Sequence, residues 1–296
     1  MSITDTNILV LGGKGQLGQA LAKVSAERGM SNLFFAGSDS LDILRPETID
    51  QYFRERQPDI IINCAAYTAV DKAEDEPEAA DAINHIAAGK LAELCSEYGK
   101  LLIHISTDFV FEGGRPAFLN ETDIAEPISV YGCSKLKGEQ VIRAVLKRHI
   151  IIRTSWLYSE FGNNFVKTML RLGDSHPEIG VIADQTGTPT YAPDLAAAIL
   201  DIISSGAAKS GTYHYSNEGA ISWYDFATAV FELSNMKVFV KALKTNEYPT
   251  KAKRPAYSVM DKAKIKRDYN VGVPYWRNSL KTCIAALKGA AIPILS

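Results

Sequence analysis

The chain has 296 residues, of which 46% are hydrophobic and 22% are charged. A chain of this length buries about three quarters of its unfolded surface, which suits one large domain or a large and a small one. These fractions exclude a disordered or fibrous protein. With 32 Lys and Arg against 34 Asp and Glu, the net charge of -2 provides no general attraction to nucleic acid or to an anionic membrane.

Nothing in the sequence indicates export or insertion into a membrane. No run approaches the roughly 20 apolar residues that span a bilayer. The opening residues 1–7 lack a basic region and lead straight into an apolar strand, so they do not form a signal peptide. The four cysteines lie far apart without a CxxC pair, which favours free thiols in a reducing compartment. We therefore expect a cytoplasmic protein.

Short apolar strands alternate with helices through the first half of the chain. Fully apolar strands in this alternation predict a parallel sheet covered on both faces, which is a doubly wound, Rossmann-like α/β fold. The acidic stretch 71–81 predicts a solvated loop, and 222–233 predicts an amphipathic helix that packs in the core. The expected strands are 7–13, 32–38, 59–66, 101–107 and 149–158, and the expected helices are 16–29, 46–57, about 78–98 and about 130–148.

The turn after the first strand carries three glycines at three-residue spacing, Gly12, Gly15 and Gly18. In such a turn the first glycine permits the tight bend, the second lets the backbone approach a pyrophosphate, and the third allows close packing of the helix. Free amides at the helix N-terminus then bind the phosphate. The strand–turn–helix context favours a dinucleotide site over a merely structural turn.

The second strand bears on which dinucleotide fits. An acid at its tip usually binds the adenosine ribose. Here the strand ends at Ala36, Gly37 and Ser38, and Asp39 follows just beyond. Because no carboxylate at the tip repels a 2′-phosphate, we expect NADPH at least as readily as NADH, and the preference between them stays open.

Tyr131 and Lys135 stand four residues apart on a predicted helix, so they share one face. A lysine ammonium beside a tyrosine favours the phenolate and lowers its pKa, so the phenol can exchange a proton with a carbonyl or an alcohol. Thr107 ends the fourth strand, where parallel sheets present reactive groups, and can hydrogen-bond the same substrate oxygen. These three residues form the predicted catalytic group.

Charge divides the chain unevenly. Residues 236–296 contain 13 Lys and Arg against 3 Asp and Glu. A basic C-terminal part beside an acidic body suits a lobe that holds an anionic ligand such as a diphosphate, and a solvated basic surface is the equal alternative. We expect a dinucleotide-binding domain and a smaller substrate-binding lobe; the first comprises 1–155 with part of 180–220, and the second comprises 156–180 and 220–296.

Together these segments resemble the dTDP-4-dehydrorhamnose reductases, a family of the extended short-chain dehydrogenase/reductase superfamily. The matching pieces run in family order from the first strand almost to the C-terminus. Besides the glycine turn and YGCSK (131–135), they are AAYTAVDKAEDEPE (65–78), STDFVFEG (106–113), RTSWLY (153–158), DQTGTPTYAPDLA (184–196), GTYHYSNEG (211–219) and RPAYS (254–258).

The resemblance implies a role for each matching position. Hydride from the cofactor would reduce the C4 carbonyl of dTDP-6-deoxy-L-lyxo-4-hexulose, Tyr131 would protonate the oxygen, and Asn84 would complete a proton relay. The nucleotide-sugar substrate would place its diphosphate in the basic lobe. Cofactor contacts would come from Gly12, Gly15, Gln16, Leu17, Asp42, Ile43, Ala66, Tyr67, Thr68, Tyr131 and Lys135, and substrate contacts from Thr107, Asp108 and Trp156.

Two positions depart from the family pattern. Phe109 stands where the family usually has tyrosine, which puts one sugar contact and the accepted sugar in doubt. Ala20 stands where some members carry a glutamate that binds magnesium at a subunit interface, so we predict no metal there. The five histidines show no metal-binding spacing either. The oligomeric state stays open, with a homodimer as one alternative.

Two other functions fit the same scaffold. One is a sugar-nucleotide epimerase or dehydratase, but dehydratases of this superfamily need an Asp-Glu pair after the threonine, and Phe109 cannot transfer the second proton. The other is a non-catalytic, NADP-binding regulatory subunit of S-adenosylmethionine synthetase, a role that some relatives have. Retention of Thr107, Tyr131 and Lys135 favours the reductase.

Overall fold

A computed structural model describes residues 6–207 and 209–289. Residues 1–5, part of the segment that we expect not to be a signal peptide, lie outside this range. Among the described residues, no helix is both long enough and apolar enough to cross a membrane.

A six-stranded parallel sheet with the order β10-β5-β4-β3-β1-β2 forms the centre of the larger part of the described chain. The chain starts in the middle of the sheet, moves outward to β2 and then returns to β3, so the strand order reverses between β1 and β3. Ligands of such sheets bind outside the carboxyl ends of the strands at this reversal. The strands are β1 (Ile8–Leu11), β2 (Leu33–Ala36), β3 (Ile60–Asn63), β4 (Leu101–Thr107), β5 (His149–Thr154) and β10 (Gly211–His214).

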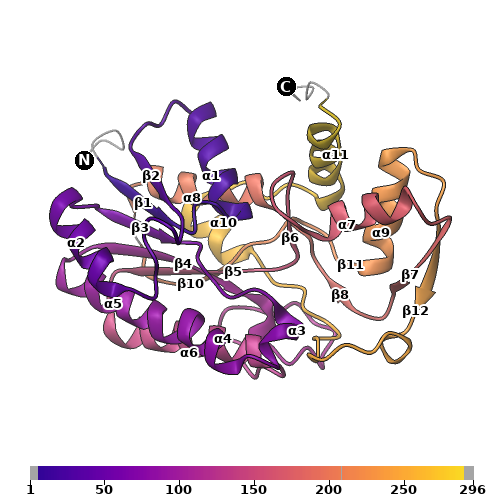
Figure 1. Ribbon diagram of the computed structural model, residues 1–296, viewed down its shortest axis with the longest axis horizontal. Helices are drawn as coiled ribbons and strands as arrows, with labels where there is room; N and C mark the ends of the chain where they lie inside the picture. Colours follow the sequence, from indigo (N-terminus) through magenta and orange to yellow (C-terminus); the bar gives the residue numbers. More distant parts are fainter. Residues whose placement is uncertain (1–5, 208, 290–296) are drawn as a thin grey trace.

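Helices cover both faces of this sheet because its strands are apolar on both sides (Figure 1). One apolar cluster joins one face to α1, α8 and α10, and the other cluster joins the opposite face to α2, α5 and α6. The predicted doubly wound α/β fold is therefore confirmed. These helices are α1 (Gln16–Glu27), α2 (Pro46–Arg56), α5 (Ala88–Glu97), α6 (Val130–Val145), α8 (Ala192–Ser204) and α10 (Ala263–Tyr269).

Two expectations about the first half need correction. The acidic stretch 71–81 is largely helical rather than a solvated loop: α3 (Val70–Ala73) and α4 (Pro77–Asp81) occupy most of it. The helix expected at about 78–98 is also subdivided, because η2 (Ala82–Ala87), a π-helical turn, separates α4 from α5. Such turns are rare and often occur at functional sites.

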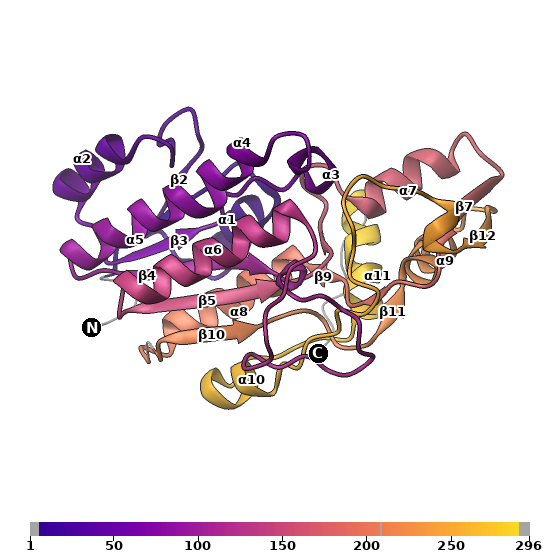
Figure 2. The same cartoon turned by 90° about the horizontal axis from the view of Figure 1, so that it is seen from below.

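A smaller lobe stands beside the sheet, at the right in Figure 1 and again in Figure 2. It has its own apolar cluster, in which aromatic residues such as Phe226 and Trp276 pack with the helices around two short strands. Its larger elements are α7 (Phe165–Gly173), β7 (Glu178–Ile182), α9 (Trp223–Ser234), β12 (Phe239–Leu243) and α11 (Trp276–Leu287). The remaining short elements are η3 (Asp108–Val110), β6 (Leu157–Tyr158), β8 (Thr186–Gly187), β9 (Thr190–Tyr191), β11 (Ile221–Ser222) and η4 (Thr245–Glu247).

Candidate active site

The glycine turn after β1 is built for close backbone approach. Gly12 has φ of 76°, a left-handed conformation that favours glycine, and a Cβ there would lie 2.7 Å from the backbone nitrogen of Ala65. A Cβ on Gly18 would lie 2.5 Å from the carbonyl oxygen of Gly12. Gly15 is the N-cap of α1, and no side chain among the described residues caps that end. The free amides of the first turn therefore suit an anionic ligand.

A cavity of about 670 Å³ opens over this turn and over the carboxyl ends of β1, β3, β4 and β5. It brings together most of the predicted site residues, although they come from segments far apart in the sequence. Those that line it are Gly12, Gly15, Gln16, Leu17, Ala66, Thr68, Thr107, Asp108, Tyr131, Lys135 and Trp156.

Three predicted cofactor residues lie outside the lining of this cavity. Ile43 is buried in the apolar cluster under α2 and α5. The Asp42 carboxylate accepts a hydrogen bond from the Leu44 amide, 3.0 Å away. The Tyr67 hydroxyl donates to Glu76 at 2.8 Å, so that side chain is already bonded elsewhere.

Tyr131 lies in the first turn of α6, and local contacts fix that turn against the end of β4. The Ser129 hydroxyl caps the helix by accepting from the Gly132 amide at 3.2 Å. A Cβ on Gly132 would lie 2.2 Å from the carbonyl oxygen of Phe109, so glycine is what allows this approach. The Tyr131 ring meets Phe109 edge to face, with 5.6 Å between ring centroids.

The electrostatics around Tyr131 differ from the sequence-based expectation. Burial raises the pKa of Tyr131 to about 12, a hydrogen bond with Thr107 acts in the opposite direction, and the Asp108 charge adds to the rise. The Lys135 ammonium does not lower this pKa in the structure, because its Nζ points to the carbonyl oxygen of Ile105, 2.6 Å away. Burial lowers the pKa of Lys135 itself to about 8. The predicted effect of the lysine on the phenol is therefore wrong for the protein without ligands.

Asp108 and Thr107 form a polar end to β4. The Thr107 hydroxyl donates to Asp108 Oδ1 at 3.2 Å and accepts from the Phe109 amide at 3.2 Å. Asp108 is 2% exposed, and its Oδ2 has no hydrogen-bond partner among the described residues. Burial raises the pKa of Asp108 to about 6. The Ser258 and Thr107 hydroxyls lower the pKa of Asp108 against this effect of burial. A buried carboxylate oxygen without a hydrogen-bond partner beside the lining of a cavity calls for a functional explanation.

Asn84 forms hydrogen bonds with the backbone beside the cavity. Its Oδ1 accepts from the Tyr67 amide at 2.9 Å, and its Nδ2 donates to the Tyr67 carbonyl oxygen at 3.1 Å and to Ser134 Oγ at 3.0 Å. The side chain comes from the π-helical turn η2. In the protein without ligands, Asn84 therefore holds the segment after β3 in place.

Trp156 forms the opposite wall of the cavity. Its φ of 46° is left-handed, a conformation that costs an ordinary residue about 1–3 kcal/mol and that the surrounding packing must hold. The indole stacks on Trp223 with 3.6 Å between ring centroids and an interplanar angle of 13°. A Cβ on Gly187 would lie 2.7 Å from the Trp156 ring, so glycine leaves room for the indole.

Sequence reasoning assigned no role to Trp223 or Arg254, which also line the cavity. Trp223 begins α9, whose pattern predicted only core packing, and no local signal marks it. Arg254 lies in the RPAYS segment that contributed to the family resemblance. Its guanidinium pairs with Asp71 of α3 at 2.6 Å, and it borders both this cavity and a neighbouring one under Trp223 and Tyr248.

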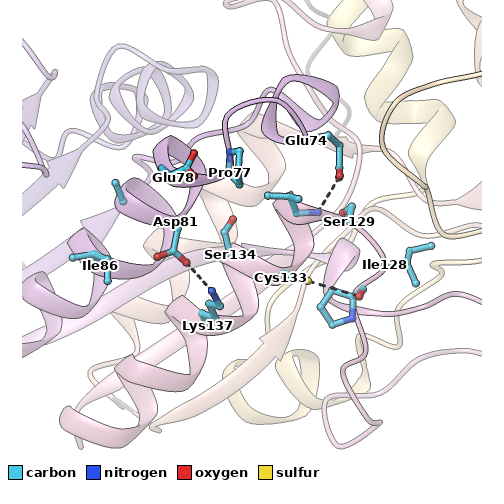
Figure 3. Close-up of a pocket in the computed structure, with 13 residues that line it drawn as sticks. Glu74, Pro77, Glu78, Asp81, Ile86, Ile128, Ser129, Cys133, Ser134 and Lys137 are labelled. Carbon is cyan, nitrogen blue, oxygen red and sulfur yellow. Dashed lines mark hydrogen bonds and ion pairs between the residues drawn. The ribbon is translucent and has the colours of Figure 1, made fainter.

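A second cavity, of about 820 Å³, lies between α4 and the start of α6 (Figure 3). Acidic side chains surround it, namely Glu74, Glu78 and Asp81. Lys137, the single basic residue in its lining, pairs with Asp81 at 3.0 Å. Its charge disfavours a phosphate-bearing ligand, so the cavity over the glycine turn is the candidate active site. No group of three metal-ligating side chains occurs within residues 6–207 and 209–289.

Known proteins match the chain along nearly its whole length. The family model described as RmlD substrate binding domain matches residues 6–288. A dTDP-4-dehydrorhamnose reductase from Sinorhizobium fredii is 41% identical over 289 residues, which cover 95% of this chain and 97% of that protein. Another from Aggregatibacter actinomycetemcomitans is 40% identical over 285 residues, which cover 93% and 97%. The crystal structure of dTDP-4-dehydrorhamnose reductase from Bacillus anthracis in complex with NADP superposes with a TM-score of 0.91 at 39% identity, covering 97% of this chain and 100% of that chain.

Proposed function

The chain belongs to the RmlD family, whose curated members include dTDP-4-dehydrorhamnose reductases, and from this premise we propose that it catalyses the reduction of dTDP-6-deoxy-L-lyxo-4-hexulose to dTDP-L-rhamnose with NADPH. The observation that carries the proposal is a single cavity that contains the glycine turn together with Thr107, Tyr131 and Lys135. The chemistry is a hydride transfer to a carbonyl with protonation of its oxygen.

NADPH fits the residues present. The glycine turn forms a cradle that a Cβ would fill, and the uncapped amides of α1 are free to bind the pyrophosphate. The exposed Lys14 lies at the tip of β2, where it pairs with Asp39 at 2.8 Å. A 2′-phosphate there would meet the Lys14 ammonium together with the Asp39 carboxylate that neutralises it, so our choice of NADPH rests on the NADP-bound relative from B. anthracis. When bound, the cofactor supplies the hydride.

The residues of the chain would then handle the carbonyl oxygen. Tyr131 donates its phenolic proton to that oxygen, and Thr107 donates a hydrogen bond that orients it. We propose that Lys135 in its ammonium form stabilises the phenolate that remains once the ligands are bound, although in the protein without ligands its Nζ is bonded to the Ile105 carbonyl oxygen. The pKa of about 12 at Tyr131 keeps the phenol protonated at neutral pH, which is the form a reductase needs.

Substrate binding falls to the smaller lobe, which we propose to consist of 156–180 and 220–296, with α10 returning to the sheet. We propose that Trp156 and the free Oδ2 of Asp108 contact the sugar and that Arg254 binds the diphosphate. We propose that the neighbouring apolar cavity, lined by Phe165, Trp223 and Tyr248, receives the nucleobase. We also propose that Asp42 and Ile43 flank the adenine of the cofactor.

A purified sample tests the function directly. It should oxidise NADPH only when the dTDP-linked 4-keto sugar is added, with one NADPH consumed for each sugar molecule reduced. Retained cofactor with no net NADPH consumption would instead indicate an epimerase or dehydratase. Co-purification with S-adenosylmethionine synthetase without turnover would indicate the regulatory subunit. We also propose a cytoplasmic homodimer. The four free cysteines support a reducing compartment, and light scattering tests the dimer.

A further inference from the structure

Three buried polar side chains form a chain under the candidate active site. Asn63 ends β3, His104 lies opposite it in β4, and Lys135 comes from α6. Each of the three is about 1% exposed. Asn63 Nδ2 lies 3.1 Å from His104 Nδ1, and His104 Nε2 lies 3.4 Å from Lys135 Nζ. The proposed mechanism uses the lysine but neither of the other two residues.

The direction of the hydrogen bonds is fixed at one end by the backbone. The Ala65 amide donates to Asn63 Oδ1 at 3.1 Å, and a backbone N–H can only donate. The Asn63 oxygen therefore faces Ala65, and the amide NH₂ faces His104. Because Nδ2 can only donate, His104 Nδ1 must accept, so it carries a lone pair. The imidazole is thus neutral and holds its proton on Nε2.

This tautomer points an N–H at the lysine. An ammonium has three donors and no acceptor, whereas a neutral amine has a lone pair that can accept from Nε2–H. The amine can still donate to the Ile105 carbonyl oxygen, 2.6 Å away, so both contacts of Lys135 are satisfied in the neutral form. In the charged form, two donors face each other at His104.

We propose that His104, oriented by Asn63, is a positioning residue that favours the neutral amine of Lys135 and thereby lowers the pH above which the active site loses its lysine charge. The link to turnover rests on the proposed function, in which the ammonium of Lys135 acts beside Tyr131. The arrangement of the protons in the free protein does not depend on that function.

Burial favours the neutral amine of Lys135 as well, whereas the other polar groups around it do not. From α6 it faces Tyr131, whose phenol is neutral. It also faces Glu139, whose charge raises the pKa of Lys135 although Arg153 at 2.7 Å and Arg143 at 3.0 Å bind that carboxylate. From the segment after β3 it faces Cys64, whose pKa burial raises to about 12, so the thiol is neutral. Burial also holds the pKa of His104 far below its usual range, which agrees with a neutral ring.

The first experiment needs no variant and no substrate. A long-range ¹H–¹⁵N spectrum of the ligand-free protein distinguishes the two neutral histidine tautomers and the charged ring. We expect His104 to show the Nε2–H tautomer throughout the neutral range. A spectrum that shows the Nδ1–H tautomer or the imidazolium would overturn the proposal.

The second experiment measures the titration of Lys135 by ¹³Cε chemical shift, with the signal assigned by its loss in Lys135→Met. His104→Gln places an amide that can rotate its oxygen toward the ammonium, without adding charge. We expect the titration midpoint to rise by about one pH unit, the scale of a lost unfavourable contact. His149→Gln is the matched control, because this histidine in β5 is also buried and bonds to the Leu146 carbonyl oxygen. It should leave the midpoint unchanged.

Asn63→Asp sharpens the result if His104→Gln folds poorly. One carboxylate oxygen can still accept from Ala65, while the other accepts from Nδ1–H and so moves the histidine proton away from Lys135. The spectrum should switch to the Nδ1–H tautomer, and the Lys135 midpoint should rise. If the tautomer does not switch, or if His104→Gln leaves the midpoint in place, the proposal fails. If the His104 tautomer and the Lys135 midpoint change as expected but the protein shows no reductase turnover, the proposed function fails and the proposal about His104 stands.

Discussion

The two walls of the active-site cavity are built in different ways. The wall that we propose for the cofactor is centred on the glycine turn, where Gly12, Gly15 and Gly18 let β1, α1 and the segment after β3 come close together. The substrate wall consists of large side chains from distant segments, including Trp156, Trp223 and Arg254. Gln16 joins the walls, since its Oε1 accepts from Ser159 and Asn164, each at 3.0 Å.

The two walls differ in how they affect the stability of the folded state. Backbone amides at a helix N-terminus need no special stabilisation, and glycine adopts its left-handed φ without strain. The substrate wall holds Trp156 in a left-handed conformation and buries Asp108 with an unpaired oxygen. Such groups persist at functional sites because the surrounding packing holds them. We therefore expect Trp156 and Asp108 to lower the stability of the folded state, whereas the glycine turn does not.

The largest expected effect is the loss of kcat when Tyr131 is changed. Tyr131→Phe should lower kcat by at least about 100-fold, because it removes the proton donor. NADPH binding, measured by fluorescence titration, should stay within about threefold, the scale of one weak neutral hydrogen bond. Tyr158→Phe is the matched control, since the Tyr158 hydroxyl is buried and has no partner among the described residues. An unchanged kcat in Tyr131→Phe would remove the mechanism.

The next prediction tests whether the buried carboxylate of Asp108 lowers the stability of the folded state. Burial raises the pKa of Asp108 to about 6, above the value of 3.8 for an unperturbed carboxyl. The folded state therefore binds this proton more tightly than the unfolded chain does, and stability is lost as the pH rises from about 4 through 6. Asp108→Asn cannot titrate, so its free energy of unfolding should exceed that of the wild type by up to about 3 kcal/mol at pH 8.

Urea unfolding at several pH values measures this difference. The gain should shrink at pH 5 and vanish near pH 4, where the wild-type carboxyl is also neutral. Asp174→Asn, which changes an exposed carboxylate, should give no such pH-dependent gain. If Asp108→Asn is less stable than the wild type at pH 8, the buried carboxylate does not lower the free energy of unfolding and this prediction is wrong.

The smallest effect separates substrate binding from cofactor binding. Arg254→Ala should raise KM for the nucleotide sugar by about 10-fold to 100-fold, the scale of charge-assisted hydrogen bonds to a diphosphate, and should leave NADPH affinity unchanged. Asp71→Asn breaks the Arg254 ion pair and keeps the guanidinium, so KM should not rise. Lys251→Ala removes a nearby cation that pairs with Asp75. An equal rise in KM in all three variants would indicate general damage to the lobe.

Local sequence patterns predict the glycine turn, but they do not predict all of either wall: Asp42, Ile43 and Tyr67 were expected at the cofactor and lie outside the lining of the cavity. Five of the six sheet strands, the glycine turn and the Tyr131–Lys135 helix follow from local apolar runs and spacing. The sixth strand, β10, is as long as β1, β2 and β3, but its residues Gly211–His214 contain no continuous apolar run, so no local pattern marks it. Trp223 and Arg254 reach the cavity only through the packing of the lobe, which spacing does not encode. The direction in which Lys135 points depends on burial and on the Ile105 carbonyl, and both are properties of the folded chain.

The fate of the hydride tests the central claim most directly. The protein is incubated with the dTDP-linked 4-keto sugar and NADPH that carries deuterium at the transferred position of its nicotinamide ring, and the sugar product is analysed by mass spectrometry and NMR. A reductase leaves a single deuterium on C4 of the product and an equal amount of NADP⁺. Product without the label, or label that returns to the cofactor, would contradict the assignment of this cavity as the site of a net reduction.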